Sequence, residues 1–364
     1  MDKDFWAVAL SLVPGIGSVL FKKLIYHFKA AESVFKASFK ELMTVEGVGI
    51  KTAHAIKNFN KEDQVQERLL TTRKKDVQVL TLENESYPSN LLKIDNPPPI
   101  LYVKGKLKRD DQFAIAVVGS RNPSKYGELA TGLITRDLAE KGITIVSGMA
   151  RGIDTISHKE ALNADGRTLA VLGSGIDVIY PPENRKLFER ITQKGAVLTE
   201  FPISTPPDSV NFPHRNRIIS GLTLGVVIIE AGYRSGSLIT AKLATRQNRM
   251  IFAVPGQIGF DRSRGTNKLI KNGAILVENA NDILNEIVPK DKLYNEASKG
   301  QSKEVKLSPN AKIVIDELSE DPVPIDSIII RTGLSVNDVS TVLLDLELRG
   351  FVKQLPGKIF IKNL

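Results

Sequence analysis

The strongest constraint on the fold is a series of short apolar segments that alternates with helical spacers from Phe113 onward. Each segment is apolar throughout and flanked by Gly or Pro. Strands of this kind are buried on both faces, which is typical of parallel sheets covered by helices. The pattern therefore predicts an α/β fold with an extended Rossmann-like, doubly wound and mostly parallel sheet. The predicted strands are 113–118, 143–146, 168–172, 196–198, 226–229, 251–254 and 274–277.

Two loops at the carboxyl ends of these strands are rich in glycine and arginine. Ligands of a doubly wound sheet bind beyond the carboxyl ends of its strands. After the first strand come Gly119, Ser120 and Arg121, whose backbone N–H groups, hydroxyl and guanidinium together suit a phosphate. After the second strand, Arg151 lies between two glycines, which suits a close approach of the backbone to a ligand. We therefore expect both loops to contact an anionic ligand.

The densest candidate cluster is the run 211–220, Asn-Phe-Pro-His-Arg-Asn-Arg-Ile-Ile-Ser. Phe212 can stack on a base while Arg215 and Arg217 bind phosphates, with the Asn216 amide beside them. This combination indicates single-stranded nucleic acid as the ligand. The alternative is that the ring lies in the core and the arginines form salt bridges.

A third anion-binding loop is expected after the strand 226–229. Ser235, Gly236 and Ser237 precede a predicted helix and place hydroxyl and N–H groups at its N-terminus. Glu230 ends the strand and is the one carboxylate placed like a catalytic acid or base. It has no second acid in an obvious relation to it, so we favour a helix-capping or arginine-pairing role.

Other patterns argue against a cofactor, a metal or a catalytic centre. Gly173 and Gly175 begin a dinucleotide fingerprint, but position 178 is Val and no Walker A sequence occurs. Asp154 and His158 are spaced i,i+4 on a predicted helix. We favour an intrahelical contact that positions the Arg151 loop, and the alternative is a hydrolytic acid–base pair. The chain has no cysteine, and its four histidines fit no metal-ligand spacing. We expect no cofactor, no metal and no catalytic residue.

The charge of the chain favours an anionic partner. Its 50 basic residues outnumber 41 acidic ones, for a net charge of +9. Residues 1–307 hold 44 basic and 33 acidic residues, whereas 308–364 hold 6 and 8, so the excess lies before the C-terminal part. A positive field of this kind attracts nucleic acid. No apolar run approaches the ~18 residues that cross a bilayer, and no signal peptide is evident, so we expect a cytoplasmic protein without membrane contact.

The segments on either side of the core predict two accessory domains. Residues 1–75 look like a helical, helix-hairpin-helix or SAM-like domain, because the pattern of 12–17 (Leu-Val-Pro-Gly-Ile-Gly) returns 32 positions later as Thr-Val-Glu-Gly-Val-Gly, each time before an amphipathic helix. Paired glycines before a helix suit a phosphate contact, and two ligand-free turns are the alternative. Residues 76–290 are predicted to form the Rossmann-like core. The core begins with an approach segment that contains a short strand at 100–103.

The remaining residues predict a linker and a winged helix. Residues 291–307 are polar and aperiodic, which indicates the linker. Residues 308–364 predict three helices, at 309–319, 324–332 and 335–349, and then a hairpin over 352–362. This order is typical of a winged helix.

The motifs, taken in order, resemble those of the DNA-processing protein A family (DprA, also called Smf), and the resemblance spans nearly the whole chain. They lie at 87–88, 118–121, 147–154, 180–181, 212–217, 235–241 and 254–256. The resemblance implies a homodimeric, non-enzymatic mediator that binds single-stranded DNA, protects incoming strands and loads RecA recombinase onto them during natural transformation. It places Gly119, Ser120, Arg121, Phe212, Arg215, Asn216 and Arg217 in the DNA pocket. The chain departs from the family at Met149, where a small residue is frequent.

Two other functions compete with this interpretation. The core also resembles nucleotide phosphoribohydrolases, with Glu230 and the loop 235–237 in comparable places, but its loop is not of their Pro-Gly-Gly type. A duplex-reading regulator would use the winged helix, yet the predicted recognition helix has Asp338, Asp345 and Glu347 against Arg349 alone. Such a helix is poorly suited to a phosphate backbone.

Overall fold

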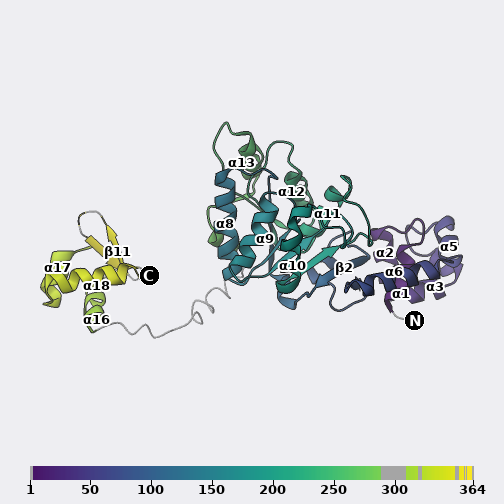
Figure 1. Cartoon of the computed structure of the whole chain (residues 1–364), viewed down its shortest axis with the longest axis horizontal. Helices are drawn as coiled ribbons and strands as arrows, with labels where there is room; N and C mark the ends of the chain where they lie inside the picture. Colours follow the sequence, from purple (N-terminus) through teal and green to yellow (C-terminus); the bar gives the residue numbers. More distant parts are fainter. Residues whose placement is uncertain are drawn as a thin grey trace. The chain divides into compact units, whose positions relative to one another are not determined.

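The computed structural model describes residues 3–287, 309–318, 322–348, 352–355, 357 and 359–362. The chain divides into two compact units, Met1–Pro289 and Lys290–Leu364, which Figure 1 shows coloured along the sequence. The predicted linker 291–307 lies outside the described residues. Each unit is described by itself.

The first unit is built on a nine-stranded sheet of order β1-β2-β6-β5-β4-β3-β7-β8-β9. The strands are β1 (Gln78–Thr81), β2 (Ile100–Gly105), β3 (Ala114–Val118), β4 (Thr144–Ser147), β5 (Thr168–Val171), β6 (Ala196–Thr199), β7 (Gly225–Ile228), β8 (Met250–Ala253) and β9 (Ile275–Leu276). The seven strands from β3 to β9 pair in parallel, and β1 and β2 extend the sheet antiparallel beyond β6. The predicted doubly wound, mostly parallel sheet is confirmed.

Every residue of β3 to β7 is buried, as strands covered on both faces require. The strand order reverses beside β3: the chain adds β4, β5 and β6 on one side and then returns to add β7 on the other. The loops after β3 and β7 therefore diverge to opposite faces of the sheet. This topological switch point is where doubly wound sheets bind ligands.

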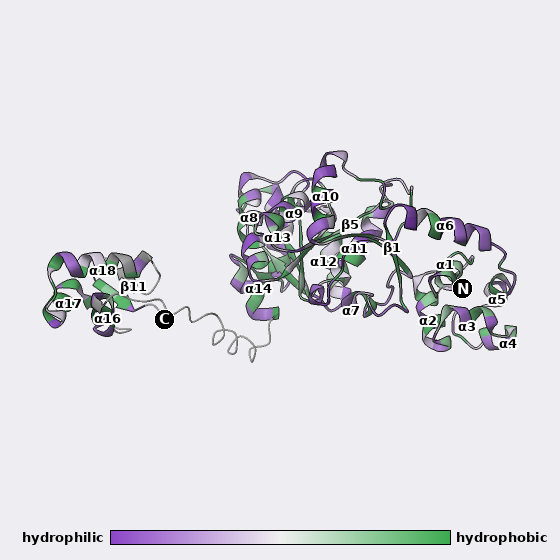
Figure 2. Cartoon of the chain, turned by 60° about the horizontal axis from the view of Figure 1, so that its bottom comes forward, coloured by the Kyte–Doolittle hydropathy of each residue, from purple (hydrophilic) through white to green (hydrophobic). Residues whose placement is uncertain are grey.

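Helices cover both faces of the sheet. Apolar clusters place one group on one face, namely α7 (Ser89–Leu92), α11 (Asn211–Gly221), α12 (Gly236–Arg246) and α13 (Arg264–Lys271). The other face carries α8 (Lys125–Glu140), α9 (Ile153–Asn163), α10 (Arg185–Lys194) and α14 (Ala280–Ile287). Figure 2 shows hydrophobic and hydrophilic residues together on these helices, as expected of helices that bury one side.

Six helices precede the sheet. They are α1 (Lys3–Ser11), α2 (Ser18–Phe28), α3 (Ala31–Lys36), α4 (Phe39–Leu42), α5 (Ile50–Lys57) and α6 (Glu62–Lys74). Gly17 and Gly49 stand directly before α2 and α5, so each predicted glycine pair opens a helix. Among the apolar residues on these two helices, Leu24, Ala53 and Ile56 are buried, whereas Val19 is exposed.

These helices share a core with the antiparallel edge of the sheet. One apolar cluster joins residues of α1, α2, α5 and α6 to Ile100 and Tyr102 of β2. The Lys22 ammonium donates hydrogen bonds to the carbonyls of Leu92 (3.2 Å) and Ile94 (2.7 Å). Figure 1 shows the helices beside β2. The six N-terminal helices thus pack directly against the edge of the sheet and share its apolar core.

The second unit has its own apolar core and a three-stranded sheet of order β10-β12-β11. Its elements are α16 (Pro309–Asp316), β10 (Val323–Pro324), α17 (Ile325–Thr332), α18 (Val336–Leu348), β11 (Val352–Leu355) and β12 (Ile359–Lys362). Three helices followed by a hairpin confirm the predicted winged helix, and β10 is an addition to it. Asp338, on the first turn of α18, accepts a hydrogen bond from the Ser335 hydroxyl at 2.6 Å. Arg349 lies outside the described residues.

Candidate functional site

A cavity of about 820 Å³ lies at the switch point of the sheet. It brings together the loops after β3 and β7 and the first turns of α11 and α12, which are far apart in the sequence. Nine of the predicted site residues line it: Gly119, Ser120, Arg121, Phe212, Arg215, Asn216, Ser235, Gly236 and Ser237. Hereafter this cavity is called the crevice. Arg151 and Arg217 do not line it.

The loop after β3 is held against the start of α9. The Ile153 N–H donates to the Ser120 carbonyl at 3.1 Å. Gly152 has φ +74°, and a Cβ there would stand 2.6 Å from the Arg121 carbonyl oxygen. Only glycine combines this conformation with such close packing of two backbones. The Arg121 side chain is exposed at the mouth of the crevice.

The run 212–217 is helical, and the helix period separates its side chains. On α11, Phe212, Arg215 and Asn216 share one face and line the crevice. Arg217 points elsewhere: it is 3% exposed and forms an ion pair with Glu200. The prediction of a phosphate contact by Arg217 is therefore not supported, and the salt-bridge alternative describes this residue.

Arg215 lines the crevice but is only 4% exposed. Its guanidinium donates to the carbonyl oxygens of Gly148, at 2.7 Å, and Val171. Burial lowers the pKa of Arg215 to about 10, and the nearby Asp154 opposes this change. Because this guanidinium donates hydrogen bonds to one carbonyl just after β4 and to another at the end of β5, it holds the ends of these two strands together. These bonds give Arg215 a positioning role, and its contact with a phosphate stays a prediction, since the residue also lines the crevice.

Asp154 and His158 have separate partners. Asp154 accepts hydrogen bonds from the N–H groups of Gly148 (3.1 Å) and Ala150 (3.4 Å), so it fixes the loop before Arg151. His158 Nδ1 lies 2.6 Å from the Thr168 hydroxyl, not in the expected contact with Asp154. Burial lowers the pKa of His158 to about 3, so the ring stays neutral near pH 7.

The same loop contains a residue in the left-handed region. Met149 is fully buried with φ +60°, and so adopts a backbone conformation that glycine, which lacks a Cβ, takes most easily. Arg151 is exposed at the end of this loop and pairs with Glu183 at 2.6 Å. Water screens an exposed ion pair of this kind, so the Arg151 guanidinium can leave Glu183 and pair with another anion.

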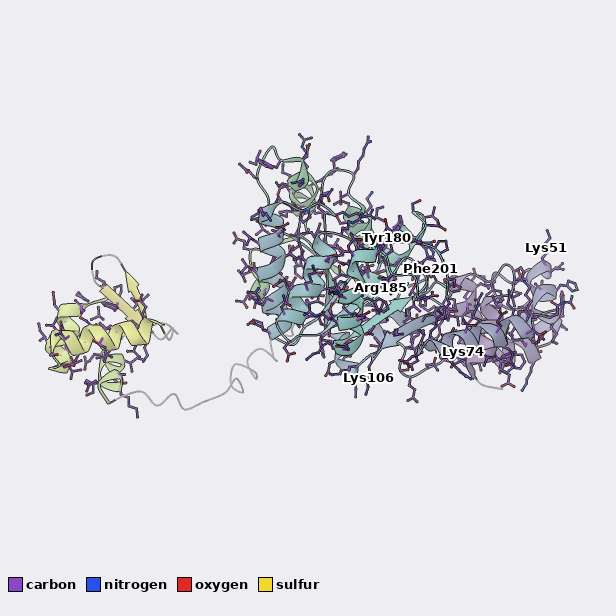
Figure 3. All side chains as sticks on the ribbon, in the orientation of Figure 1. Lys51, Lys74, Lys106, Tyr180, Arg185 and Phe201 are labelled. Atoms are coloured by element: carbon purple, nitrogen blue, oxygen red, sulfur yellow. The ribbon has the colours of Figure 1, made fainter. Side chains whose placement is uncertain are left out.

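Two aromatic rings form one wall of the crevice. Phe212 is half-buried, and a Cβ on Gly173 would stand 2.7 Å from its ring. The Tyr180 ring lies 5.8 Å from it, centroid to centroid, at an angle of 40°. The guanidinium carbon of Arg121 stands 5.6 Å from the Phe212 centroid. Tyr180, labelled on the first unit in Figure 3, is 39% exposed. A planar base and an anionic group would both find a partner here.

Three arginines surround the mouth of the crevice. Arg121 follows β3, Arg234 follows β7 and Arg262 follows β8. All three are exposed, and none has an ion-pair partner among the described residues. Sequence reasoning missed Arg234, Arg262 and Tyr180 as site residues. Arg234 directly precedes the predicted Ser-Gly-Ser loop, and Tyr180 belongs to the family motif at 180–181. Both residues therefore lie next to motifs that the sequence analysis did identify.

The loop after β7 has the expected helix-capping geometry. Ser235 is the N-cap of α12, and its hydroxyl accepts from the Ser237 N–H at 3.4 Å. Glu230 accepts from the Ser124 N–H at 2.9 Å and also from the Ser124 hydroxyl. Since Ser124 is the N-cap of α8, Glu230 anchors a helix start, as the capping interpretation predicted.

The chain itself fills the space around the incomplete dinucleotide fingerprint. Gly173 packs against the Phe212 ring, and a Cβ on Gly175 would stand 2.6 Å from the Pro202 carbonyl oxygen. Within the described ranges no group of His, Asp and Glu is placed to hold a metal ion, and no helix there is long and apolar enough to cross a membrane. The arrangement suits an anionic, aromatic ligand in an open crevice.

Known proteins share both the sequence and the fold. The chain is 37% identical to protein Smf of Synechocystis, over 98% of each chain, and 35% identical to protein Smf of Escherichia coli, over 98% of this chain and 95% of that one. DNA processing protein DprA of Bacillus subtilis is 36% identical over 80% of this chain and 99% of its own length.

Two solved structures are similar. The X-ray structure of DNA processing protein A from Streptococcus pneumoniae has a TM-score of 0.68 at 33% identity and covers 79% of this chain and 99% of its own. A structure of DNA processing protein A from Helicobacter pylori, reported for its single-stranded DNA binding mode, has a TM-score of 0.52 at 34% identity and covers 57% and 95%.

Family models match all three parts of the chain. A helix-hairpin-helix motif matches residues 6–69, and the DprA winged helix domain matches residues 299–358. The model described as DNA recombination-mediator protein A matches residues 78–288, which contain the whole crevice. The chain therefore belongs to the DNA recombination-mediator protein A family.

Proposed function

We propose that the chain binds single-stranded DNA in the crevice and acts as a non-enzymatic mediator of recombination. The observation that carries this proposal is the wall formed by Tyr180 and Phe212 inside a mouth surrounded by Arg121, Arg234 and Arg262. Aromatic rings stack on bases and arginines bind phosphates, which are the two parts that any single strand presents. The Helicobacter pylori relative, reported for single-stranded DNA binding, supports the proposal.

The crevice favours single strands over duplexes. Both rings lie along its wall, so a base can reach them only after it has left its stack. Unstacking a duplex costs a few kcal/mol per step, whereas a flexible strand offers its bases at a much lower cost. Stacking and phosphate contacts do not distinguish one base from another, so the expected sequence preference is weak.

A competition experiment tests this function. A labelled oligothymidine is bound to the full chain and then displaced with unlabelled single-stranded or duplex DNA of the same length. We expect the single strand to compete at much lower concentration, and the affinity to fall steeply with salt because phosphate contacts release counterions. Equal competition by the duplex would refute the proposal.

A non-enzymatic role agrees with the position of Glu230. Its carboxylate caps α8 through Ser124, and a Cβ on Gly127 would stand 2.6 Å from its carboxyl carbon. A group enclosed in this way is not presented to a glycosidic bond. Incubation with nucleoside monophosphates should release no free base; release would favour a phosphoribohydrolase.

Membership of the family supports a more detailed proposal. We propose that the chain protects incoming strands and loads RecA recombinase onto them during natural transformation, and that it acts as a homodimer. The measurement is RecA filament formation on single-stranded DNA coated with a competing binding protein. The chain should accelerate filament formation, and Arg121→Ala should lose this effect. Sedimentation of the chain tests the dimer.

The winged helix is expected to contribute little to single-strand affinity. The α18 sequence contains no basic residue, and the first unit is compact and has its own core. Deleting residues 300–364 should therefore leave the affinity for oligothymidine nearly unchanged in the displacement assay. A thermal scan of the truncated chain verifies its folding, and a large loss of affinity in a folded protein would contradict the prediction.

A further inference from the structure

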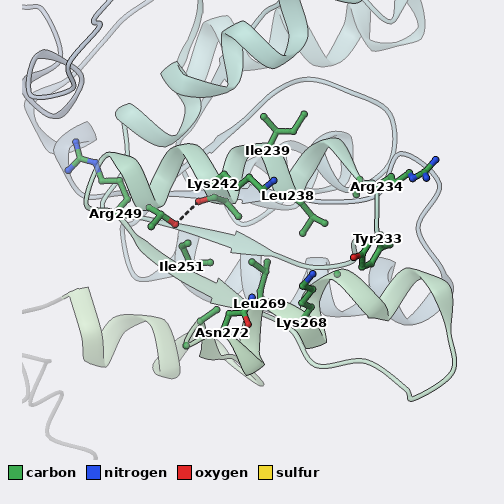
Figure 4. Close-up of a pocket in the computed structure, with 16 residues that line it drawn as sticks. Tyr233, Arg234, Leu238, Ile239, Lys242, Arg249, Ile251, Lys268, Leu269 and Asn272 are labelled. Atoms are coloured by element: carbon green, nitrogen blue, oxygen red, sulfur yellow. Dashed lines mark hydrogen bonds between the residues drawn. The ribbon is translucent and has the colours of Figure 1, made fainter.

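A second cavity, of about 720 Å³, lies between α12 and α13. Its floor is apolar and includes Leu238, Ile251 and Leu269, from α12, β8 and α13. Figure 4 shows α12 along one side of it and Tyr233 and Lys268 together at one end. Hereafter it is called the groove.

All of the charged side chains that line the groove are basic. Its lining includes Arg234, Lys242, Arg249 and Lys268 and no acidic residue. Arg249 is engaged by the protein, because its guanidinium donates to the carbonyl oxygens of Asn90 and Gly221. The other three are exposed and have no ion-pair partner among the residues the structure describes. An apolar floor with three available cations suits a ligand that is both planar and anionic.

Tyr233 gives the groove an exposed aromatic platform. Tyr233 is 65% exposed, and the Lys268 ammonium stands 4.9 Å from the centroid of its ring. Beside a lysine, the ring can stack on one base while the ammonium binds the adjacent phosphate.

The groove adjoins the crevice. Arg234, Ser235 and Ile239 line both cavities, so the first turn of α12 separates them. We infer that the groove is a second subsite for the same strand: the strand leaves the crevice across Arg234, stacks a base on Tyr233 and places phosphates on Lys242 and Lys268. This inference rests on the proposed single-strand function. It predicts a binding site longer than the crevice.

Two lengths of oligothymidine test the inference on the full chain by fluorescence anisotropy. One has about 5 nucleotides and the other about 16, near the limits of a single-strand-binding module. Lys242→Ala combined with Lys268→Ala should lower affinity for the longer oligonucleotide by about fivefold or more and flatten its salt dependence by roughly 1.4 log units per log unit of salt. The shorter oligonucleotide should bind as it does to the wild type.

Matched variants separate charge and stacking from general effects. Lys141→Ala combined with Lys159→Ala removes the same charge from exposed lysines that line neither cavity, and should bind both lengths as the wild type does. Tyr233→Ala should weaken the longer oligonucleotide by about fivefold or more, since one stacked base is lost, whereas Tyr233→Phe should not.

The failures are distinguishable. If the wild type binds neither length, the single-strand function itself is wrong and the inference falls with it. If the wild type binds both and the groove variants bind the longer strand equally well, only the inference is overturned. Altered self-association of those variants with unchanged affinity would also overturn it, and would identify a second copy of the chain as the occupant.

Discussion

Replacing Arg121 with alanine is expected to lower the affinity for oligothymidine by roughly 10- to 150-fold, the loss of one charge-assisted contact of about 1.5–3 kcal/mol. Its guanidinium is exposed at the mouth of the crevice and stands over the Phe212 ring, so it can reach a phosphate beside a stacked base. Anisotropy titrations at several salt concentrations measure the change. The slope of log affinity against log salt should fall by about 0.7, as one phosphate contact requires.

Two variants control this experiment. Arg121→Lys keeps the charge but loses the planar fork, so its affinity should lie between those of the wild type and the alanine variant. Arg136→Ala removes an arginine that bonds to Glu160 on the α8 and α9 face, and should leave binding unchanged. Full affinity of Arg121→Ala, or an equal loss in Arg136→Ala, would show that the crevice is not the binding site.

The sheet and its site were predictable because burial leaves a strong mark on the sequence. Strands covered on both faces must be apolar throughout, and the loops that follow parallel strands must meet at one edge. Gly119–Arg121 and Ser235–Ser237 could therefore be placed together from the order of the strands alone. A partly exposed edge strand carries a weaker mark: β1 lies at the edge of the sheet with one exposed and one half-exposed residue, and the sequence analysis does not predict it.

The roles of individual arginines were less predictable. Arg215 and Arg217 are two residues apart in a basic run, but on a helix this spacing sends them in different directions. Arg217 forms an ion pair with Glu200, whereas Arg215 donates hydrogen bonds to one carbonyl just after β4 and to another at the end of β5. Those partners are distant in sequence, so no local pattern distinguishes a positioning arginine from one that binds a ligand. For the same reason Arg262, whose loop reaches the crevice only in the folded chain, could not be found.

Replacing Asp154 with alanine is expected to destabilise the first unit by about 3–5 kcal/mol, the usual effect of leaving a buried charge without its opposite. Asp154 and Arg215 both lie close to Gly148, where a Cβ would stand 2.7 Å from an atom of each. Burial raises the pKa of Asp154, and the charge of Arg215 and the N–H groups of Gly148 and Ala150 oppose the rise. The main thermal transition should fall by roughly 6–20 °C.

Further variants decide whether charge or hydrogen bonding carries this effect. Asp154→Asn keeps an acceptor for the loop N–H groups but removes the charge. A large loss of stability in this variant would assign the effect to the charge interaction between Asp154 and Arg215. Combining Asp154→Ala with Arg215→Met removes both charges and should recover part of the stability, because no unpaired charge remains buried. Asp165→Ala, at an exposed pair with Lys194, should change stability little. If Asp154→Ala unfolds at the wild-type temperature, Arg215 does not depend on Asp154, and the two strand ends beside the crevice are held by the carbonyl contacts alone.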